Sequence, residues 1–347
     1  MTLVRHVLDL AGFVLLMAGP VPACVYLARN SRVLPQVSRG LHSALVFLLA
    51  WFVLQVNVAL LLGILGLLRW RLLVLAEIVL FAAALPLRHR TDWDPSQRPG
   101  PVDLTRPHAV VIACLASFVT ITLWNVAIGP MRNRDSLAYH LPAMATFYQT
   151  GSLATLDHFG QIARYPYDWE VLSALFLFPF GEDFLVALPN VLALLALACA
   201  ISATSQAFGA ERTAALTLGT IFAALPGVLR HVGTMRVDLQ FAASFMAAVY
   251  LAVAWRSSRG ALSGAIAVAA LALMPGIKMT GVGYAPLVAL WGLLAARAVP
   301  ACREDGERTE APPGRSLCVG LAGAGAALLA GGYWYANNYR VTGNPFG

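Results

Sequence analysis

Long apolar runs, separated by short stretches rich in arginine and proline, make up most of this sequence. About ten of these runs have the length that a helix needs to cross a bilayer, or come close to it. They lie near residues 7–28, 42–68, 70–87, 108–129, 184–207, 213–229, 237–255, 261–276, 279–297 and 317–336. Only 12% of the residues are charged, and the mean hydropathy of +0.70 lies outside the range of soluble domains. We therefore predict an all-α polytopic membrane protein with about ten transmembrane helices.

The distribution of arginine predicts the orientation of these spans, because cytoplasmic connections carry an excess of basic residues. If the spans alternate, one set of connections holds fourteen of the twenty-four basic residues. They are Arg29, Arg32, Arg39, Arg88, Arg90, Arg98, Arg106, Arg212, Arg256, Arg259, Arg297, Arg303, Arg308 and Arg315. We expect this set to be cytoplasmic. Residues 130–183 and both termini would then be extracytoplasmic, which in a bacterium is the periplasmic side of the inner membrane.

Other classes of protein find no support in the sequence. The basic residues form short clusters and no stripe with aromatic partners, so no nucleic-acid partner is expected. The five cysteines are widely spaced and odd in number, which indicates neither a disulfide framework nor a metal knuckle. The Gly/Ala-rich residues 320–325 are not followed by Lys-Ser/Thr, so we interpret them as a site of close helix packing and not as a phosphate loop.

Charged and aromatic side chains gather in the connection of residues 130–183. The acidic members are Asp135, Asp157, Asp168, Glu170, Glu182 and Asp183, and they alternate with Tyr139, Tyr148, Tyr165, Tyr167 and Trp169. Asp135 should begin a short helix whose regular form is limited by Pro142. That residue either caps the helix or does chemistry, and the pattern leaves both open. A second short helix, near residues 169–181, is expected to lie in the membrane interface.

Three ionisable residues lie within or beside the apolar spans. A charge at the centre of a membrane helix costs roughly 2.5–3.5 kcal/mol on insertion scales, so each needs a partner or a role. We expect Glu77 to pair with a neighbouring helix. Asp238 suits the start of a helix electrostatically, and a catalytic role fits it equally well. Lys278, the only lysine in the chain, could hold a phosphate at headgroup level or simply extend its ammonium to the interface.

A metal site is the weaker alternative for this connection. His140 and His158 could be combined with Asp135 and Asp157, but no closely spaced pair of ligands supports such a site. We therefore predict no resident metal or other cofactor, although the sequence does not exclude a divalent ion.

A known family shares an ordered series of motifs with residues 108–347. The motifs are Arg134-Asp135-Ser136-Leu137-Ala138-Tyr139-His140-Leu141-Pro142, Gly151-Ser152-Leu153, Tyr165-Pro166-Tyr167-Asp168-Trp169-Glu170, Gly276-Ile277-Lys278-Met279-Thr280-Gly281 and Asn337-Asn338-Tyr339-Arg340-Val341-Thr342-Gly343-Asn344-Pro345-Phe346. In order and spacing they resemble the GT-C fold membrane glycosyltransferases. The protein-mannosyltransferase-like and aminoarabinose-transferase-like bacterial members, which use polyprenyl-phosphate sugars, are the most similar in pattern.

Two features depart from this family. The acidic pair that usually opens the first large loop is here Asp135-Ser136, which leaves one carboxylate. The sequence ends soon after Asn344-Pro345, where relatives continue into further spans, so we expect an incomplete or reduced member. Residues 1–107 would form N-terminal spans and a cytoplasmic linker, and residues 108–347 the GT-C-like catalytic core.

The resemblance implies a sugar transfer from a polyprenyl-phosphate donor to a glycan, lipid or protein acceptor outside the cytoplasm, in contact with membrane lipids. Asp135 would be the general base, and Lys278 with Arg236 or Arg230 would neutralise the phosphate. The remaining substrate-binding positions would be Tyr139, His140, Arg164, Tyr165, Trp169, Glu170 and Asp238. The alternatives are a lipid or solute transporter or flippase, and an inactive scaffold of an envelope assembly. We find no internal repeat of the kind transporters commonly show, which favours the enzyme.

Overall fold

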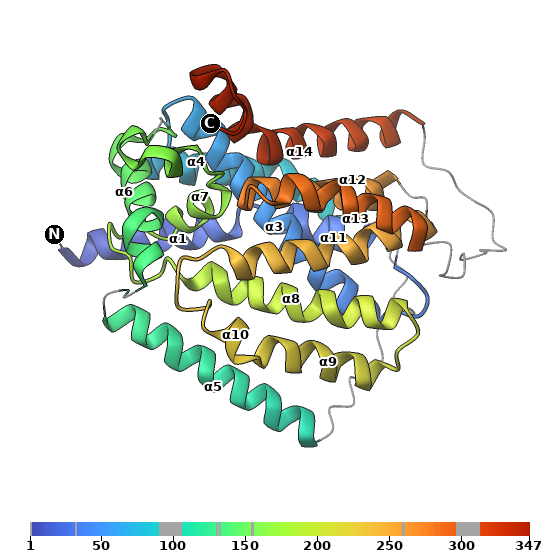
Figure 1. Cartoon of the computed structure of the whole chain (residues 1–347). Coiled ribbons are helices and arrows are strands. Elements are labelled where there is room, and N and C mark those ends of the chain that lie inside the picture. The colour runs from blue at the N-terminus through green and yellow to red at the C-terminus, as the bar shows by residue number, and fades with distance from the viewer. Residues whose placement is uncertain are drawn as a thin grey trace.

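The computed structural model describes residues 2–31, 33–89, 106–129, 131, 133–153, 156–258, 261–295 and 313–347. All regular structure in these ranges is helical (Figure 1). The elements are α1 (Thr2–Ala18), α2 (Val21–Asn30), α3 (Arg39–Ile64), α4 (Trp70–Ala84), η1 (Leu85–His89), α5 (Arg106–Ile128), η3 (Ser136–His140), α6 (Leu141–Thr150), η4 (Asp157–Arg164), α7 (Asp168–Ala174), α8 (Leu188–Ala207), α9 (Arg212–Ala224), α10 (Pro226–Leu229), α11 (Asp238–Ser258), α12 (Ala261–Ile277), α13 (Gly281–Ala295) and α14 (Pro313–Thr342). The prediction of an all-α fold is confirmed for this part of the chain.

The helices identify the chain as a membrane protein. Five segments are long and apolar enough to cross a bilayer, namely His6–Asn30, Arg39–Ile64, Trp70–Leu87, Leu188–Ala207 and Asp238–Arg256. Three shorter apolar helices accompany them, at Ile112–Asn125, Ala261–Ile277 and Gly281–Leu294. Helix α5 leaves Ile121 and Trp124 about two-thirds exposed, which suits a surface covered by lipid. The total of about ten transmembrane helices stays a prediction.

The first span is broken in its middle. Helix α1 ends at Ala18 and α2 begins at Val21 after Pro20, because a proline cannot supply the amide that a continuous helix needs. Two side chains of α3 bind the carbonyls near the break: Trp51 Nε1 donates to Met17 O at 3.1 Å, and Gln55 Nε2 donates to Leu16 O at 2.8 Å. Free backbone groups at membrane depth are thus bound by protein, as a nonpolar solvent requires.

Glu77 of α4 lies against this break. Its side chain is fully buried, and neither carboxylate oxygen has a hydrogen-bond partner among the described residues. A Cβ atom on Gly19 would overlap the carboxyl group, so the glycine provides the space that Glu77 occupies. The predicted pairing of Glu77 with a neighbouring helix is not found in the described part of the chain.

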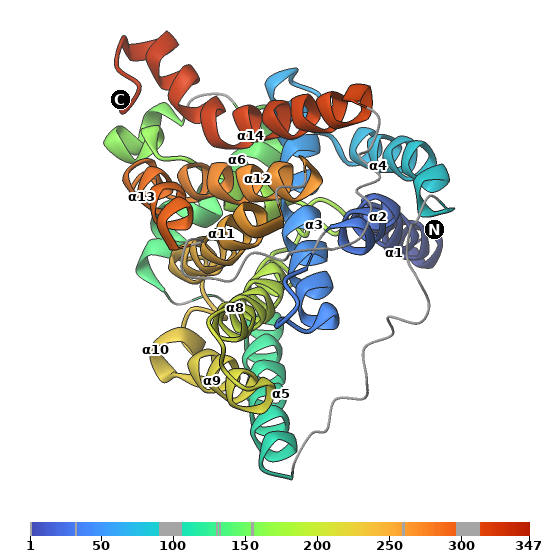
Figure 2. The ribbon, with the colours of Figure 1, turned by 90° about the vertical axis from the view of Figure 1, so that its right-hand side faces the viewer.

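Helices α3, α8, α11 and α12 form the centre of the bundle, α14 lies along its upper side against α12, and α5 and α9 lie at its lower side (Figures 1 and 2). Helices α12 and α14 form the most extensive contact of the bundle among the described helices. A Cβ on Gly331 would stand 2.6 Å from the carbonyl oxygen of Ala272, so only glycine lets the two backbones meet there. The sequence predicted close packing at residues 320–325; of the glycines in that run the structure describes the surroundings of Gly325, where an added Cβ would meet nothing within 4 Å.

The connection of residues 130–183 forms a cap of short helices at one end of the bundle (Figure 1). Helix α7 is shorter than predicted, and every one of its residues is buried. It packs against α3 and α6, with Trp169, Val171 and Leu172 in the core. The predicted interfacial placement of this helix is wrong, because its apolar side chains are covered by protein and not by lipid.

Both ends of the chain lie at the same end of the bundle as α6 (Figure 1). The last turn of α13 and the first turn of α14 lie at the opposite end (Figure 1). This arrangement fits the predicted alternation of the spans. The side of the membrane that each end faces stays a prediction.

Candidate active site

A cavity of about 490 Å³ lies where the cap of short helices meets the ends of α11 and α12. Eight of the ten side chains predicted for the site line it: Asp135, Tyr139, His140, Tyr165, Glu170, Arg236, Asp238 and Lys278. Pro166, Tyr167, Val237, Ile277, Met279 and Thr280 complete the lining. Residues separated by more than a hundred positions in the sequence thus share one cavity.

The segment that carries Asp135 is held by Asn133. The amide oxygen of Asn133 accepts hydrogen bonds from the backbone N–H groups of Asp135 and Ser136, at 3.1 and 3.2 Å. Asn133 therefore caps the π-helical turn η3, and Asp135 makes no side-chain capping bond. Single π-helical turns are rare and are frequent at functional sites. Of the two roles that the sequence left open for Asp135, the geometry does not support that of a cap.

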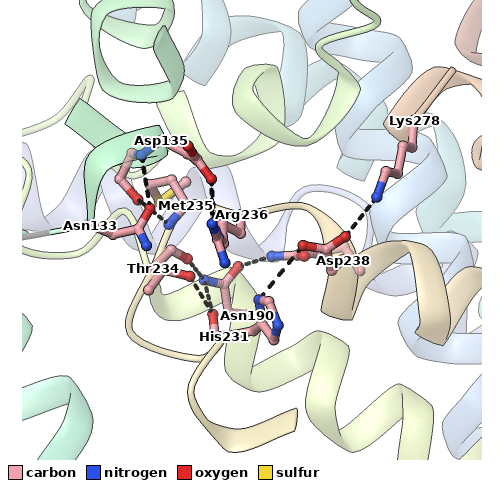
Figure 3. A network of polar contacts seen from close by, with 11 residues as sticks. Asn133, Asp135, Asn190, His231, Thr234, Met235, Arg236, Asp238 and Lys278 are labelled. Carbon is pink, nitrogen blue, oxygen red and sulfur yellow. Dashed lines mark hydrogen bonds and ion pairs between the residues drawn. The ribbon is translucent and has the colours of Figure 1, made fainter. Parts of the chain in front are cut away.

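Asp135 is instead bound by Arg236, from the connection between α10 and α11 (Figure 3). Both Nε and Nη2 of Arg236 donate to the same oxygen, Oδ2 of Asp135, at 2.8 and 2.6 Å. The side chain of Asp135 is 34% exposed and that of Arg236 is 38% exposed, so solvent reaches the pair. Since only one carboxylate oxygen accepts from Arg236, the other stays available to a ligand in the cavity.

Ser136 connects the two segments that carry this pair. Its hydroxyl oxygen accepts a hydrogen bond from the backbone N–H of Met235 at 2.9 Å, and the serine is fully buried. Met235 directly precedes Arg236, so this bond fixes the position of the guanidinium beside Asp135. Ser136, which stands where the resembled motif has a second carboxylate, therefore has a structural partner in this chain.

Lys278 and Asp238 form a second ion pair in the cavity (Figure 3). Nζ of Lys278 donates to Oδ1 of Asp238 at 2.6 Å, and Nδ1 of His231 lies 3.9 Å from Oδ2 of the same carboxylate. Burial lowers the pKa of His231, and the nearby Asp238 carboxylate opposes that shift. Lys278 follows the last residue of α12, and Asp238 is the first residue of α11, so the helix ends meet at this pair.

Aromatic rings and a buried dyad form the other wall. Nδ1 of His140 donates to Oε1 of Glu170, and both side chains are almost fully buried. The ring of Tyr139 contacts that of His140 at a tilt of 40°, with centroids 4.1 Å apart, and it meets Tyr165 edge to face. Burial, with help from the Asp135 and Glu170 carboxylates, raises the pKa of Tyr139 to about 12. Its phenol therefore stays protonated at neutral pH and can donate a hydrogen bond.

Asn190 of α8 is a positioning residue that sequence reasoning missed. Its amide donates to the carbonyl oxygens of Val232 and Thr234, at 3.1 and 2.7 Å, and so holds the connection that leads to Arg236 (Figure 3). The sequence did contain a signal for this role, because an amide side chain within an apolar span needs hydrogen-bond partners. In the structure Asn190 is fully buried.

Two predicted site residues do not line the cavity. Trp169 is buried in the core, where its indole N–H donates to Oδ1 of Asn190 at 3.0 Å and its ring packs edge to face on Phe52. Arg164 lies beside the end of the chain, and its backbone oxygen accepts a hydrogen bond from Asn338 at 2.8 Å. The structure gives Trp169 a supporting contact instead of the ring face toward the cavity that the resemblance implied.

Asp168 lies fully buried behind the cavity lining. Nε1 of Trp334 donates to its Oδ1 at 2.7 Å, and Oδ2 has no hydrogen-bond partner among the described residues. Burial raises the pKa of Asp168 well above its ordinary value of 3.8; the Trp334 N–H opposes the rise, and the Glu170 charge adds to it. Such a group favours the protonated form.

This shift predicts a pH dependence of stability. Above 3.8 the unfolded chain releases the Asp168 proton while the folded protein keeps it, so the folded state binds more protons and the free energy of unfolding falls as the pH rises. Asp168→Asn should remove this decline while it keeps the oxygen that accepts from Trp334. Thermal unfolding from about pH 4 to about pH 8 checks it, with exposed Asp183→Asn as the matched control. An unchanged pH slope in Asp168→Asn would contradict the assignment.

No group of three or more His, Cys, Asp or Glu side chains that could hold a metal occurs in the part of the chain that was described. The side chains of Asp157 and His158, which entered the alternative metal site, lie outside that part. His140 instead pairs with Glu170, and Asp135 pairs with Arg236.

Comparisons of the chain with models of protein families, with curated proteins and with solved structures found no match. The class of the protein therefore follows from its own fold and site: a helical membrane protein with a charged, aromatic-lined cavity at one end of its bundle.

Proposed function

We propose that this protein is a membrane glycosyltransferase of GT-C type, which transfers a sugar from a polyprenyl-phosphate donor to an extracytoplasmic acceptor in the bacterial inner membrane. One observation carries the proposal. A single cavity at the end of the bundle combines a carboxylate with a free oxygen, two cations and phenol rings. These are the groups needed to accept a proton, bind a phosphate and contact a sugar.

The two cations suit the phosphate of the donor. Arg236 and Lys278 are each more than a third exposed at the side chain, and both line the cavity. Arg236 binds Asp135 and Lys278 binds Asp238, and the guanidinium and ammonium N–H groups that these bonds do not use can donate to the phosphate. The phosphate charge that grows as the sugar leaves would be stabilised by the same cations. The lipid tail anchors the donor in the membrane, so no nucleotide-binding domain is needed.

Asp135 would act as the general base. The acceptor hydroxyl gives its proton to the free oxygen of Asp135, and its own oxygen forms a bond to the anomeric carbon. The bond from that carbon to the phosphate oxygen breaks with its electron pair, and polyprenyl phosphate leaves. Attack opposite to the leaving group inverts the configuration. Arg236 orients the base through the other carboxylate oxygen.

Tyr139, Tyr165 and the His140–Glu170 dyad would bind the sugar. The phenol of Tyr139 is a hydrogen-bond donor at neutral pH, and Tyr165 is 43% exposed, so it can present a ring face to a sugar. Nδ1 of His140 is occupied by Glu170, which leaves Nε2 as the ring nitrogen available to the cavity. This wall would select the sugar, while the cations select the phosphate.

Replacing Lys278 by alanine is expected to raise the KM for the donor about tenfold, since losing a hydrogen bond to a charged group costs roughly 1.5–3 kcal/mol and this one is partly exposed. Lys278→Arg should restore part of the affinity because it keeps the charge. Steady-state transfer at increasing donor concentration measures it. Arg71→Ala, an exposed residue on α4, is the control. An unchanged KM in Lys278→Ala would remove the phosphate role from this residue.

Transfer of labelled sugar tests the proposed function itself. The purified chain in lipid vesicles is incubated with a panel of polyprenyl-phosphate sugars and with hydroxyl acceptors. We expect transfer, or donor hydrolysis by water, with at least one donor. A folded protein that consumes none of the donors would oppose the proposal and favour the transporter or scaffold alternatives.

A further inference from the structure

A second, smaller cavity of about 250 Å³ lies between the end of α3 and the last turns of α14. Its lining consists of Gly63, Ile64, Ser152, Leu153, Tyr333, Asn337, Arg340 and Val341. None of these residues lines the larger cavity, and the proposed function uses none of them. The cavity therefore needs a separate explanation.

The walls of this second cavity are held by backbone hydrogen bonds. The N–H of Leu153 donates to the carbonyl of Gly63 at 3.2 Å, and the N–H of Leu68 donates to the carbonyl of Gly151 at 2.9 Å. Gly151 has a φ of +69°, which favours glycine, and the turn it forms brings Ser152 to the end of α3. The cavity is thus a feature of the folded chain and does not depend on one side-chain rotamer.

Charge distinguishes the two cavities. In the larger cavity each cation faces a carboxylate. Among the residues that the structure describes, the smaller cavity is lined by one cation, Arg340, by the neutral donors Ser152, Tyr333 and Asn337, and by no acidic side chain. Arg340 Nη2 donates to Oδ1 of Asn337 at 3.1 Å, which leaves the other guanidinium N–H groups available. Such a lining favours an anion, and the planar guanidinium suits a phosphate.

A series of aromatic rings connects the linings of the two cavities. The ring of Trp334 contacts that of Tyr167, with centroids 5.6 Å apart, and that of Tyr333, with centroids 4.9 Å apart. Tyr167 lines the larger cavity and Tyr333 the smaller one. Asp135 and Lys278 line only the larger cavity, so a ligand in the smaller one would not touch them.

Exposed apolar side chains surround the smaller cavity. Ile64, Leu65 and Leu67 at the end of α3 are 43%, 60% and 44% exposed, and Val341 of α14 is 45% exposed. Helix α3 is one of the five described segments that are long and apolar enough to cross a membrane. These side chains lie where acyl chains would contact the protein, next to a cationic cavity of headgroup size.

We propose that this second cavity is a binding site for a phosphate group, presented by the headgroup of an anionic phospholipid whose acyl chains lie along α3 and α14. Arg340 binds the phosphate oxygens, and Ser152 and Asn337 donate further hydrogen bonds. This proposal does not rest on glycosyl transfer, because none of its residues lines the larger cavity.

The test measures lipid retained by the purified chain in phosphatidylcholine nanodiscs that contain increasing fractions of phosphatidylglycerol. The variants are Arg340→Gln, which removes the charge, and Ser152→Phe, which fills the cavity and leaves the charge in place. Exposed Arg134→Gln is the control for a general loss of positive charge. A second arm adds glycerol 3-phosphate and inorganic phosphate to separate a lipid source from a soluble one.

We expect the wild type and Arg134→Gln to retain phosphatidylglycerol, and both cavity variants to bind it about tenfold more weakly. If soluble phosphates compete at similar concentrations, the cavity still binds a phosphate group, but its ligand is a soluble phosphate and not a lipid. Equal retention by the wild type and both cavity variants would overturn the proposal. If Arg340→Gln fails to fold, the filled cavity of Ser152→Phe decides between the outcomes.

Discussion

Replacing Asp135 by asparagine is expected to lower the rate of sugar transfer about 10²- to 10⁴-fold, which is the usual contribution of a positioned general base. Asparagine keeps the size of the side chain and an oxygen that can accept from Arg236, but it cannot take the acceptor proton. The ion pair is partly exposed, so its loss should change the free energy of unfolding by only about 0–1 kcal/mol. Single-turnover transfer and thermal unfolding, measured on one preparation, separate the two effects.

Asp183→Asn serves as the matched control for this variant. Asp183 belongs to the same connection, is exposed and does not line the cavity, so its substitution should leave transfer unchanged. Full activity in Asp135→Asn would move the base to Glu170 or Asp238, which are the other acidic side chains of the lining. Asp168 is not a candidate, because it lies outside the lining and is fully buried.

Replacing Gly276 by alanine should destabilise the protein by about 3 kcal/mol, at the upper end of the usual range for overpacking. A Cβ at this position would lie less than 3.0 Å from both Oδ2 of Asp168 and the backbone oxygen of Ala330. The Ala330 oxygen belongs to a helix backbone and cannot rotate away, so α12 and α14 would have to separate. Thermal unfolding in detergent measures the loss.

Gly283→Ala is the control for the glycine substitution. Gly283 is also in a helix, and a Cβ there meets nothing within 4 Å. Alanine in a helix is favoured over glycine by about 0.5–1 kcal/mol, so this variant should be as stable as the wild type or slightly more so. A Gly276→Ala protein with the stability of Gly283→Ala would contradict the close packing of α12 against α14.

Much of the secondary structure could be predicted from the sequence, since a membrane solvent requires long apolar helices wherever the chain crosses it. A helix lies at each of the predicted runs. The short helix α7 was predicted from the apolar character of its residues, yet that character could not show what covers them. Apolar side chains suit lipid and a protein core equally, and the structure shows that protein covers Trp169.

Residue types pointed to part of the cavity lining, and the resemblance in motifs supplied the rest, Arg236 among them. Charge is scarce in this chain, so carboxylates and cations near membrane depth were candidates wherever they occurred. That rule found Asp238 and Lys278, which line the cavity, and also Glu77, which lies elsewhere and has no partner among the described residues. The scarcity of charged residues identifies unusual positions, but it does not show which of these side chains contact one another.

The sequence by itself determined that this chain folds as membrane helices with polar chemistry concentrated in residues 130–183, because hydropathy and charge are local properties of the chain. Only the tertiary structure decided which side chains contact one another. It joined Asp135 to Arg236 across 101 positions, placed the Ser136 hydroxyl on the backbone that carries Arg236, and moved Trp169 behind the cavity as a support for Asn190. Each of these contacts depends on how distant helices pack, which no local pattern specifies.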